Sequence, residues 1–332
     1  MSQIVLGIGT SHSPLLAIPP ERWAERAADD CKRPTFPLAD GRSITYEQLA
    51  AETGNRYAAV ATLEHFIPLA ARAQANLDRL AEALKAARPD LVVIVGDDQD
   101  ELFLLEHMPA VAIYYGDTIV MQPRAEARPQ IPAWHRACLP VYRQDAALRH
   151  PGAPGYARAV IEGLLDHGID VGGSIGVPEP VRAGFGHAFG FVLQRLLRNR
   201  PVPVLPVLLN TYFRPNVPRA WRCHDIGRAL AQVIAAQPDT RRVAIVASGG
   251  LSHFATDEAL DLGVLHALRD GDAAALRALP VAALRSGSSE ILNWVLAGGA
   301  LAALRRTWLD YLPVYRTPAG TGIGLGFMLW QA

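Results

Sequence analysis

The sequence predicts a single α/β domain in which a central mixed β-sheet is covered by helices on both faces. Short, continuously apolar segments of strand length recur along the chain, and segments with helical periodicity separate them. Half of the 332 residues are hydrophobic, which is enough for a large core. We therefore expect one domain over residues 1–332.

The expected elements alternate along the chain. Segments with the composition of buried strands are 4–11, 91–97, 110–116, 202–210, 243–250 and 322–330. Helices are expected at 56–88, with a break near Pro68, and at 156–166, 186–198, 225–236, 257–268, 273–278 and 289–305. This alternation is typical of a sheet whose strands are buried on both faces.

Two segments interrupt this alternation. Residues 16–55 mix proline, charged and aromatic residues with weak periodicity, and we interpret them as an excursion that either covers a site as a lid or packs on the surface. Residues 122–155 are rich in proline and are expected to form a long irregular loop with a helix at one end. Long ordered loops in compact enzymes are often functional.

Charge, cysteine content and hydropathy exclude several classes of protein. The 32 basic and 32 acidic residues cancel, so nothing indicates nucleic acid as a partner. Cys31, Cys138 and Cys223 are few and widely spaced, which argues against a disulfide scaffold and fits a reducing cytoplasm. The apolar N-terminal segment lacks the basic start of a signal peptide, and no apolar stretch is long enough to span a bilayer. We expect a cytoplasmic protein with no membrane contact.

Three of the ten histidines occupy the same kind of position. His12 follows the first predicted strand in GIGTSHSP, and His253 follows another in VASGGLSHF. His187 lies in GFGHAFGFVLQRLL, where glycines end and an apolar helix begins. Each could equally be a helix-capping or packed residue. Because ligands in open α/β sheets bind beyond the carboxyl ends of the strands, the three together favour a metal or acid–base site.

Acidic residues reach the same edge of the predicted sheet. The strand at 91–97 runs into the cluster DDQDE, which places Asp98 and Gln99 at its tip. Glu290 begins an apolar helix after SGSS, where Ser288 or Ser289 is a plausible N-cap. A glutamate in this first turn is favoured by the helix dipole, so an electrostatic cap is slightly favoured over a metal ligand from spacing alone.

The order of these motifs resembles the class III extradiol ring-cleavage dioxygenases. The closest type is the catalytic subunit of protocatechuate 4,5-dioxygenase, with its gallate and 3-O-methylgallate relatives. The motifs GIGTSHSP, GDDQ, GFGHAFG, SGGLSH and SGSSEILNWVLAGGAL extend the resemblance over nearly the whole chain. Residues 16–55 have no counterpart in the simplest member of that family, and we interpret them as a lid or as an insertion that replaces a small partner subunit.

The resemblance implies an Fe(II)-dependent enzyme that cleaves a carboxylated catechol, such as protocatechuate, gallate or 3-O-methylgallate, with O₂, and that assembles as a homo-oligomer. It assigns His12 and Glu290 as metal ligands, with open coordination positions for substrate and O₂. It assigns His187 as the acid–base residue. His253 is expected to orient or act on the substrate, with structural capping as the alternative, and Ser11 is expected to orient His12.

One position departs from the family pattern. Gln99 stands where the family has its second histidine ligand, and an amide oxygen is a weaker donor to Fe(II) than imidazole. Three interpretations remain open. Gln99 binds the metal through its side-chain oxygen, Asp98 or Asp97 takes its place, or the metal site is lost. The corresponding alternatives to a dioxygenase are a metal-dependent enzyme of other chemistry, such as a hydrolase, and a non-catalytic binding protein.

Overall fold

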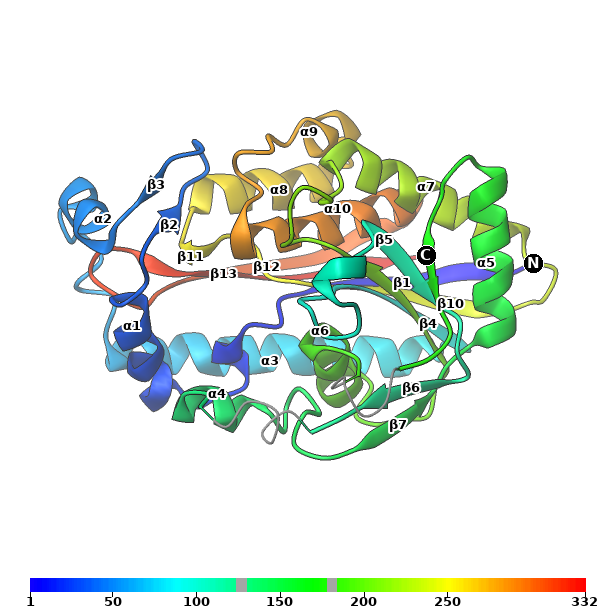
Figure 1. Cartoon of the computed structure of the whole chain (residues 1–332), viewed down its shortest axis with the longest axis horizontal. Helices are drawn as coiled ribbons and strands as arrows, with labels where there is room; N and C mark the ends of the chain where they lie inside the picture. Colours follow the sequence, from blue (N-terminus) through cyan, green and yellow to red (C-terminus); the bar gives the residue numbers. More distant parts are fainter. Residues whose placement is uncertain (124–129, 178–183) are drawn as a thin grey trace.

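The computed structural model is built around one large mixed sheet. Over the residues that the structure describes, which are 1–123, 130–177 and 184–332, this sheet has nine strands. Their bounds are β1 (Gln3–Thr10), β4 (Leu91–Asp97), β5 (Val111–Tyr114), β8 (Gly172–Ser174), β9 (Val204–Leu209), β10 (Arg242–Ser248), β11 (His253–Ala255), β12 (Arg305–Tyr315) and β13 (Thr321–Gln331). Their spatial order is β11-β13-β1-β10-β4-β9-β5-β8, and β12 pairs with β13 (Figure 1).

The centre of the sheet is parallel and its two sides are antiparallel. β1, β10, β4 and β9 are neighbours that run in the same direction. β13 is antiparallel to β1, and β5 is antiparallel to β9. Because the four central strands are parallel, their carboxyl ends lie at one edge of the sheet, where ligand sites of α/β proteins form.

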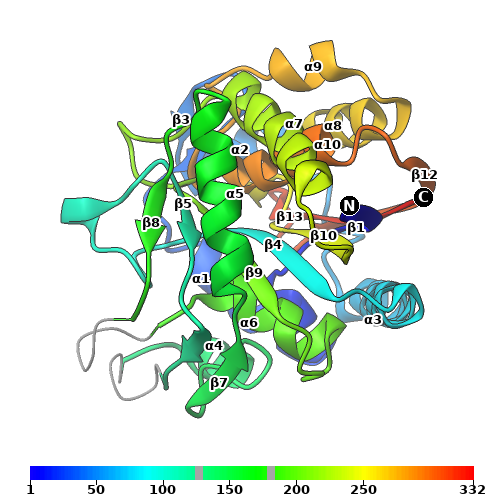
Figure 2. The same ribbon diagram turned by 90° about the vertical axis from the view of Figure 1, so that its right-hand side faces the viewer.

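Helices cover both faces of the sheet. One layer contains α5 (Pro154–Asp166), α7 (Ala220–Ala236), α8 (Glu258–Asp270), α9 (Ala273–Arg277) and α10 (Ile291–Ala300). The other contains α1 (Trp23–Asp30), α3 (Leu63–Ala87), α4 (Ala133–Cys138) and α6 (His187–Phe191), which continues as a π-helical turn over Val192–Leu196. Figure 2 shows the sheet between α3 on one side and α7, α8 and α10 on the other. The predicted fold class is confirmed.

The continuously apolar strands explain the two cores. Successive side chains of a strand point to opposite faces of a sheet. In β4, Val93 and Val95 belong to the core under α5, α7 and α10, whereas Val92 and Ile94 belong to the core under α3 and α6. A strand buried on both faces therefore needs an apolar residue at every position.

All six predicted strands are present, but three predicted helices were wrong in extent. The helix predicted at 225–236 begins already at Ala220. The helix predicted at 56–88 begins only at Leu63, and it continues without a break through Pro68, which lies exposed in its second turn.

The helix predicted at 289–305 ends at Ala300, and β12 follows it. β12 was not predicted because its sequence, RRTWLDYLPVY, is neither continuously apolar nor alternating, and the strand is partly exposed over most of its length.

The two interrupting segments are more ordered than their composition indicated. Residues 16–55 contain α1, the hairpin of β2 (Phe36–Pro37) and β3 (Ser43–Ile44), and α2 (Tyr46–Thr53). Within 122–155 a helix was expected at one end, whereas α4 lies inside the segment. The strand β7 (Leu148–Pro151), which pairs with β6 (Thr118–Met121), was not expected. Part of this predicted loop, residues 124–129, lies outside the described residues. Among the described residues, no helix has both the length and the apolar character needed to cross a bilayer.

Candidate functional site

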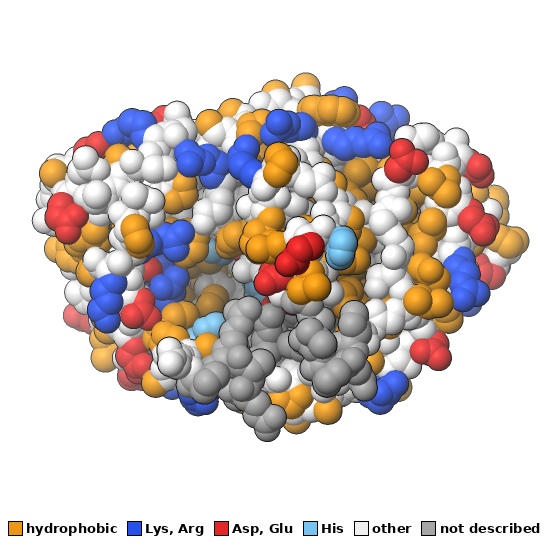
Figure 3. All heavy atoms as spheres, in the orientation of Figure 1, with side chains coloured by type: hydrophobic (Ala, Val, Ile, Leu, Met, Phe, Trp, Pro, Cys, Tyr) orange, Lys and Arg blue, Asp and Glu red, His pale blue; other side chains and the backbone are white. Residues whose placement is uncertain are grey.

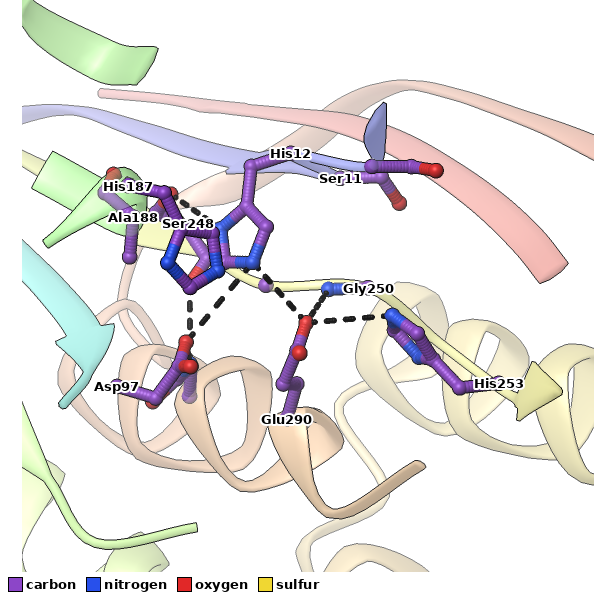
Figure 4. Close-up of polar contacts among 12 residues, drawn as sticks. Ser11, His12, Asp97, His187, Ala188, Ser248, Gly250, His253 and Glu290 are labelled. Carbon is purple, nitrogen blue, oxygen red and sulfur yellow. Dashed lines mark hydrogen bonds and ion pairs between the residues drawn. The ribbon is translucent and has the colours of Figure 1, made fainter. Parts of the chain in front are cut away.

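The predicted site residues gather around one cavity at the carboxyl edge of the central strands. Its volume is about 210 Å³, and its lining includes His12, Gln99, His187, His253 and Glu290. His12 follows the end of β1, and Gln99 follows the end of β4. His187 begins α6, His253 begins β11, and Glu290 immediately precedes α10. Figure 4 shows the imidazoles of His12 and His253 directed toward the carboxylate of Glu290, and His187 beside His12. The expected convergence of these segments is present in the fold.

His12 is oriented by a hydrogen bond that the sequence did not indicate. Its Nδ1 lies 3.0 Å from Ser248 Oγ at the end of β10, and that hydroxyl donates its one proton to the Ala188 carbonyl at 2.7 Å. The Ser248 oxygen must therefore accept from Nδ1–H. This selects the tautomer in which Nε2 of His12 carries a lone pair.

The Nε2 atom of His12 is buried and has no hydrogen-bond partner. It lies 3.2 Å from Glu290 Oε2 and 4.0 Å from Asp97 Oδ1. A lone pair facing two carboxylates is unfavourable unless a cation or a proton lies between them. The arrangement thus has the donor set of a divalent-metal site.

Glu290 is held in place as a carboxylate. It accepts the Gly250 N–H at 2.6 Å and lies 3.6 Å from His253 Nε2. Burial by itself would raise the pKa of Glu290, but the imidazoles of His253 and His12, where they carry a proton, and the Gly250 N–H lower it below its usual range. The side chain makes no hydrogen bond that caps α10. The sequence position of Glu290 allowed either a helix cap or a metal ligand. These contacts favour a side chain directed into the site over a cap.

Asp97 is a second carboxylate at the same place. It ends β4 and is fully buried, and burial together with the charge of Glu290 raises its pKa. It accepts hydrogen bonds from Gln99 Nε2 at 2.7 Å and from Asn293 Nδ2 at 3.2 Å. Ligand atoms of His12, Asp97 and His187 lie within 4.8 Å of one another. From the sequence, Asp98 was preferred to Asp97 as a possible metal ligand.

Gln99 and Asp98 have different roles in the turn after β4. Gln99 Nε2 donates to Asp97 and also, at 3.3 Å, to Glu290 Oε1, so the amide bridges the two carboxylates. Asp98 accepts the backbone N–H groups of Glu101, Leu102 and Phe103 at 2.7 to 3.2 Å. Its carboxylate therefore stabilises the turn that presents Gln99 to the cavity.

His187 begins α6, directly after Gly186. Its Nδ1 lies 3.1 Å from Glu101 Oε1, and its ring meets that of His12 edge-on, with centroids 4.6 Å apart. Burial opposes a charge on this imidazole, but Glu101 outweighs it and raises the pKa of His187 to about 9. Because Nδ1 donates to Glu101, Nε2 is the nitrogen that can exchange a proton with a ligand.

The structure also places His253 and Ser11. Nδ1 of His253 donates to the Leu251 carbonyl at 2.8 Å, which directs Nε2 toward Glu290, and burial lowers the pKa of this imidazole. Ser11 does not orient His12 as expected. Its hydroxyl accepts the Gly326 N–H of β13, and Ser248 provides the hydrogen bond to His12 instead.

Sequence reasoning missed Ser248 and Glu101, the partners that orient His12 and His187. A signal for Ser248 was available, because it ends a buried strand, and β10 pairs with β1 so that Ser248 lies opposite Thr10. The signal for Glu101 was its place in the acidic cluster, but nothing in the local pattern linked it to a histidine 86 residues away.

Comparisons with known proteins identify the family to which the chain is similar. The family described as catalytic LigB subunit of aromatic ring-opening dioxygenase matches residues 67–326. A 2,3-dihydroxyphenylpropionate/2,3-dihydroxicinnamic acid 1,2-dioxygenase of Photorhabdus laumondii is 29% identical over 176 residues, which is 53% of this chain and 46% of the relative. A gallate dioxygenase of Pseudomonas putida is 42% identical over 53 residues, 16% of this chain and 15% of the relative. The matches thus span less than half the length of these curated relatives.

Proposed function

Since the chain belongs to the family of catalytic LigB subunits of aromatic ring-opening dioxygenases, we propose that it is an extradiol dioxygenase that uses Fe(II) to cleave a carboxylated catechol. The observation that supports this most directly is the buried Nε2 of His12, whose lone pair faces Glu290 and Asp97. A metal-binding imidazole beside carboxylates suits Fe(II) chemistry.

The proposed ligands are His12 and Glu290, with a third from Asp97 or Gln99. Asp97 already presents a carboxylate oxygen toward His12, whereas Gln99 would have to turn its amide oxygen inward in place of the nitrogen. Fe(II) held there supplies positive charge that favours the ionised catechol and the redox capacity that O₂ chemistry requires. Ser248 keeps His12 in the ligating tautomer.

His187 is the proposed acid–base residue. Asp97 and Glu290 contribute to its raised pKa, so a cation bound between them would lower that pKa and free Nε2 to take a proton from a substrate hydroxyl. The imidazolium would return this proton to oxygen as the ring opens. Glu101 holds Nδ1 and stabilises the imidazolium in between.

Tyr142 supports the same arrangement, because its hydroxyl donates to the His12 carbonyl at 2.8 Å and its ring contacts that of His187. His253 lies on the far side of Glu290 and would contact the bound ring or orient that carboxylate.

The size of the cavity supports a single-ring substrate, because cavities of about 150 Å³ already accept benzene. Gallate, protocatechuate and 3-O-methylgallate are therefore the compounds to test first. We also propose that residues 16–55 act as a cover for the site, since Arg26 of α1 lines the cavity. A homo-oligomeric assembly and a cytoplasmic location remain predictions from the family resemblance.

The test is metal loading followed by O₂ uptake. Protein purified without oxygen is loaded with Fe(II), its iron content is measured, and each of the three compounds is added while O₂ consumption is followed. We expect near one iron per chain and O₂ uptake with at least one compound. Iron binding without uptake of O₂ would favour the alternative of a different metal-dependent reaction, and no iron binding would favour a non-catalytic binding protein.

Two variants separate the proposed roles. Glu290→Gln removes a ligand and should weaken iron binding by more than about 100-fold, since even loss of an outer hydrogen-bond partner costs about 10- to 100-fold. His187→Gln should keep the iron and lower kcat by about 10²- to 10⁴-fold. His65→Gln, at an exposed histidine near the start of α3, is the matched control and should change neither. Loss of iron from the His187 variant would contradict its assignment as acid–base residue.

A further inference from the structure

Two arginines from distant parts of the chain meet at one wall of the cavity. Arg26 comes from α1, within residues 16–55, and Arg316 comes from the turn between β12 and β13. Both contact the same buried carboxylate, since Asp30 lies 3.2 Å from Arg26 Nη1 and 2.7 Å from Arg316 Nε. We call Arg26, Asp30 and Arg316 the arginine cluster. Both arginines line the cavity that contains His12 and Glu290.

The arginine cluster has more positive than negative charge. Asp30 is one carboxylate shared by two guanidinium groups, and it also accepts the Thr321 hydroxyl at 2.9 Å. The adjacent Asp29 accepts the Trp134 indole N–H at 2.7 Å and pairs with Lys32 at the surface. One positive charge at this wall is thus left over, which is costly to bury unless an anion arrives to accompany it.

Arg26 is the arginine placed to receive that anion. Arg316 is only 4% exposed, and its Nε donates to Asp30. Arg26 is 19% exposed, and its guanidinium lies 5.0 Å from the centre of the Trp134 ring, which restricts the orientation of the planar group. Burial and the neighbouring charge of Arg316 lower the pKa of Arg26 to about 10, so it keeps its charge at neutral pH.

We infer that Arg26 binds the carboxylate of the aromatic substrate and thereby selects acidic over uncharged catechols. This inference rests on the proposed function and names the residue that would determine its specificity. The lining of the cavity combines the carboxylates and imidazoles of the proposed reactive site with two guanidinium groups. In Figure 3 a hollow on this face shows histidine side chains, and basic side chains lie along one side of it.

The chemistry fits a ring that carries hydroxyls at one end and a carboxylate at the other. A guanidinium can donate two parallel N–H groups to a carboxylate, and this fixes the direction of the ring as well as its charge. The hydroxyls would then point toward His12, His187 and Glu290. Since residues 16–55 supply Arg26, this segment would determine which substrates are accepted, while the central sheet supplies the reactive groups.

The first experiment avoids metal and turnover. Binding of 4-hydroxybenzoate and of phenol to the metal-free protein is measured by calorimetry, because neither compound has the paired hydroxyls of a catechol. The wild type should bind 4-hydroxybenzoate at least about tenfold more tightly than phenol. Arg26→Met should weaken 4-hydroxybenzoate binding by about 10- to 100-fold and leave phenol binding unchanged, and Arg26→Lys should lose less.

Arg22→Met is the matched control. Arg22 lies next to the start of α1 but pairs with Glu25 at the surface, so this variant should bind both compounds as the wild type does. Unchanged 4-hydroxybenzoate binding in the Arg26→Met variant would overturn the inference. Equal loss of both compounds would also overturn it, because that result indicates a structural role.

A second experiment separates this inference from the proposed function. With iron-loaded protein, Arg26→Met should raise KM for the carboxylated substrate by about 10- to 100-fold and leave KM for catechol unchanged. Selective loss of 4-hydroxybenzoate binding in a protein without dioxygenase activity would support the anion site and contradict the proposed reaction. Dioxygenase activity with an unchanged KM in the variant would support the reaction and contradict the anion site.

Discussion

Two clusters of charged residues beside one cavity differ in how they are built. His12, Asp97, Gln99 and Glu290 form a histidine–carboxylate cluster. Its first three members come from the ends of β1 and β4, two parallel strands on either side of β10, and Glu290 directly precedes α10. The arginine cluster of Arg26, Asp30 and Arg316 joins a helix of the inserted segment to the β12–β13 turn. The first therefore depends on the sheet, and the second on the docking of residues 16–55.

This difference indicates how the two clusters can change separately. Backbone hydrogen bonds of the sheet bring the strand ends that carry the histidine–carboxylate cluster together. The arginine cluster depends on a few side-chain contacts to one buried carboxylate, and the short hairpin and α2 nearby add only the small apolar core of Phe36, Ile44, Leu49 and Ala319. Changes to residues 16–55 should alter selectivity before they alter the reactive centre.

The largest effect on stability should come from removing the negative charge of Asp30, with which both Arg26 and Arg316 pair. Asp30→Asn leaves the almost fully buried Arg316 without its counter-charge, which should lower the free energy of unfolding by about 3–5 kcal/mol. Glu25→Gln breaks an exposed ion pair of the same helix and should cost at most about 1 kcal/mol. Chemical denaturation of the two variants measures both. Equal losses would mean that the arginine cluster does not anchor the segment.

A smaller effect should separate the two serines near His12. Ser248→Ala removes the acceptor of the Nδ1–H of His12, so iron affinity should fall by about 10- to 100-fold. Ser11→Ala removes a hydroxyl that contacts β13 instead and should leave iron affinity unchanged. Anaerobic iron titration decides between them. A larger loss in the Ser11 variant would favour the expectation from sequence over the hydrogen bonds of the fold.

The most gradual effect, spread over about three pH units, concerns a buried carboxylate of α8. Asp261 accepts hydrogen bonds from Ser252 and Tyr311, and burial raises its pKa from 3.8 to about 7. The folded state keeps this proton where the unfolded state has released it, so stability from this group is complete below about pH 4 and is lost as the pH rises to about 7. The total is at most about 4 kcal/mol, at about 1.4 kcal/mol per pKa unit.

Asp261→Asn should remove this dependence. The stability of the wild type relative to the variant should fall between pH 4 and pH 7 and then stay constant, because pH effects of other groups cancel in the difference. Urea unfolding at several pH values gives this difference. Parallel pH curves for the two proteins would contradict a raised pKa at Asp261.

Much of the fold and part of the site could be predicted from local pattern. The buried strands were recognised because a strand covered on both faces is apolar at each position, and β12 was missed because it is partly exposed. His12, His187, His253 and Gln99 were placed at one edge because each lies next to a strand end or a helix start. Ser248 and Glu101, which orient His12 and His187, were not recognised, because hydrogen bonds between distant residues leave no local pattern.

The sequence by itself determined the fold class, the edge of the sheet where the site lies and the residue types that it offers. Only the tertiary structure decided that Asp97 faces His12 while Asp98 stabilises a turn, because adjacent side chains separate where a strand ends. It also decided that Arg26 and Arg316 share Asp30, although Asp30 and Arg316 lie 286 positions apart in the sequence. Periodicity reports which face of an element is buried, whereas strand order and turn geometry determine which buried groups meet.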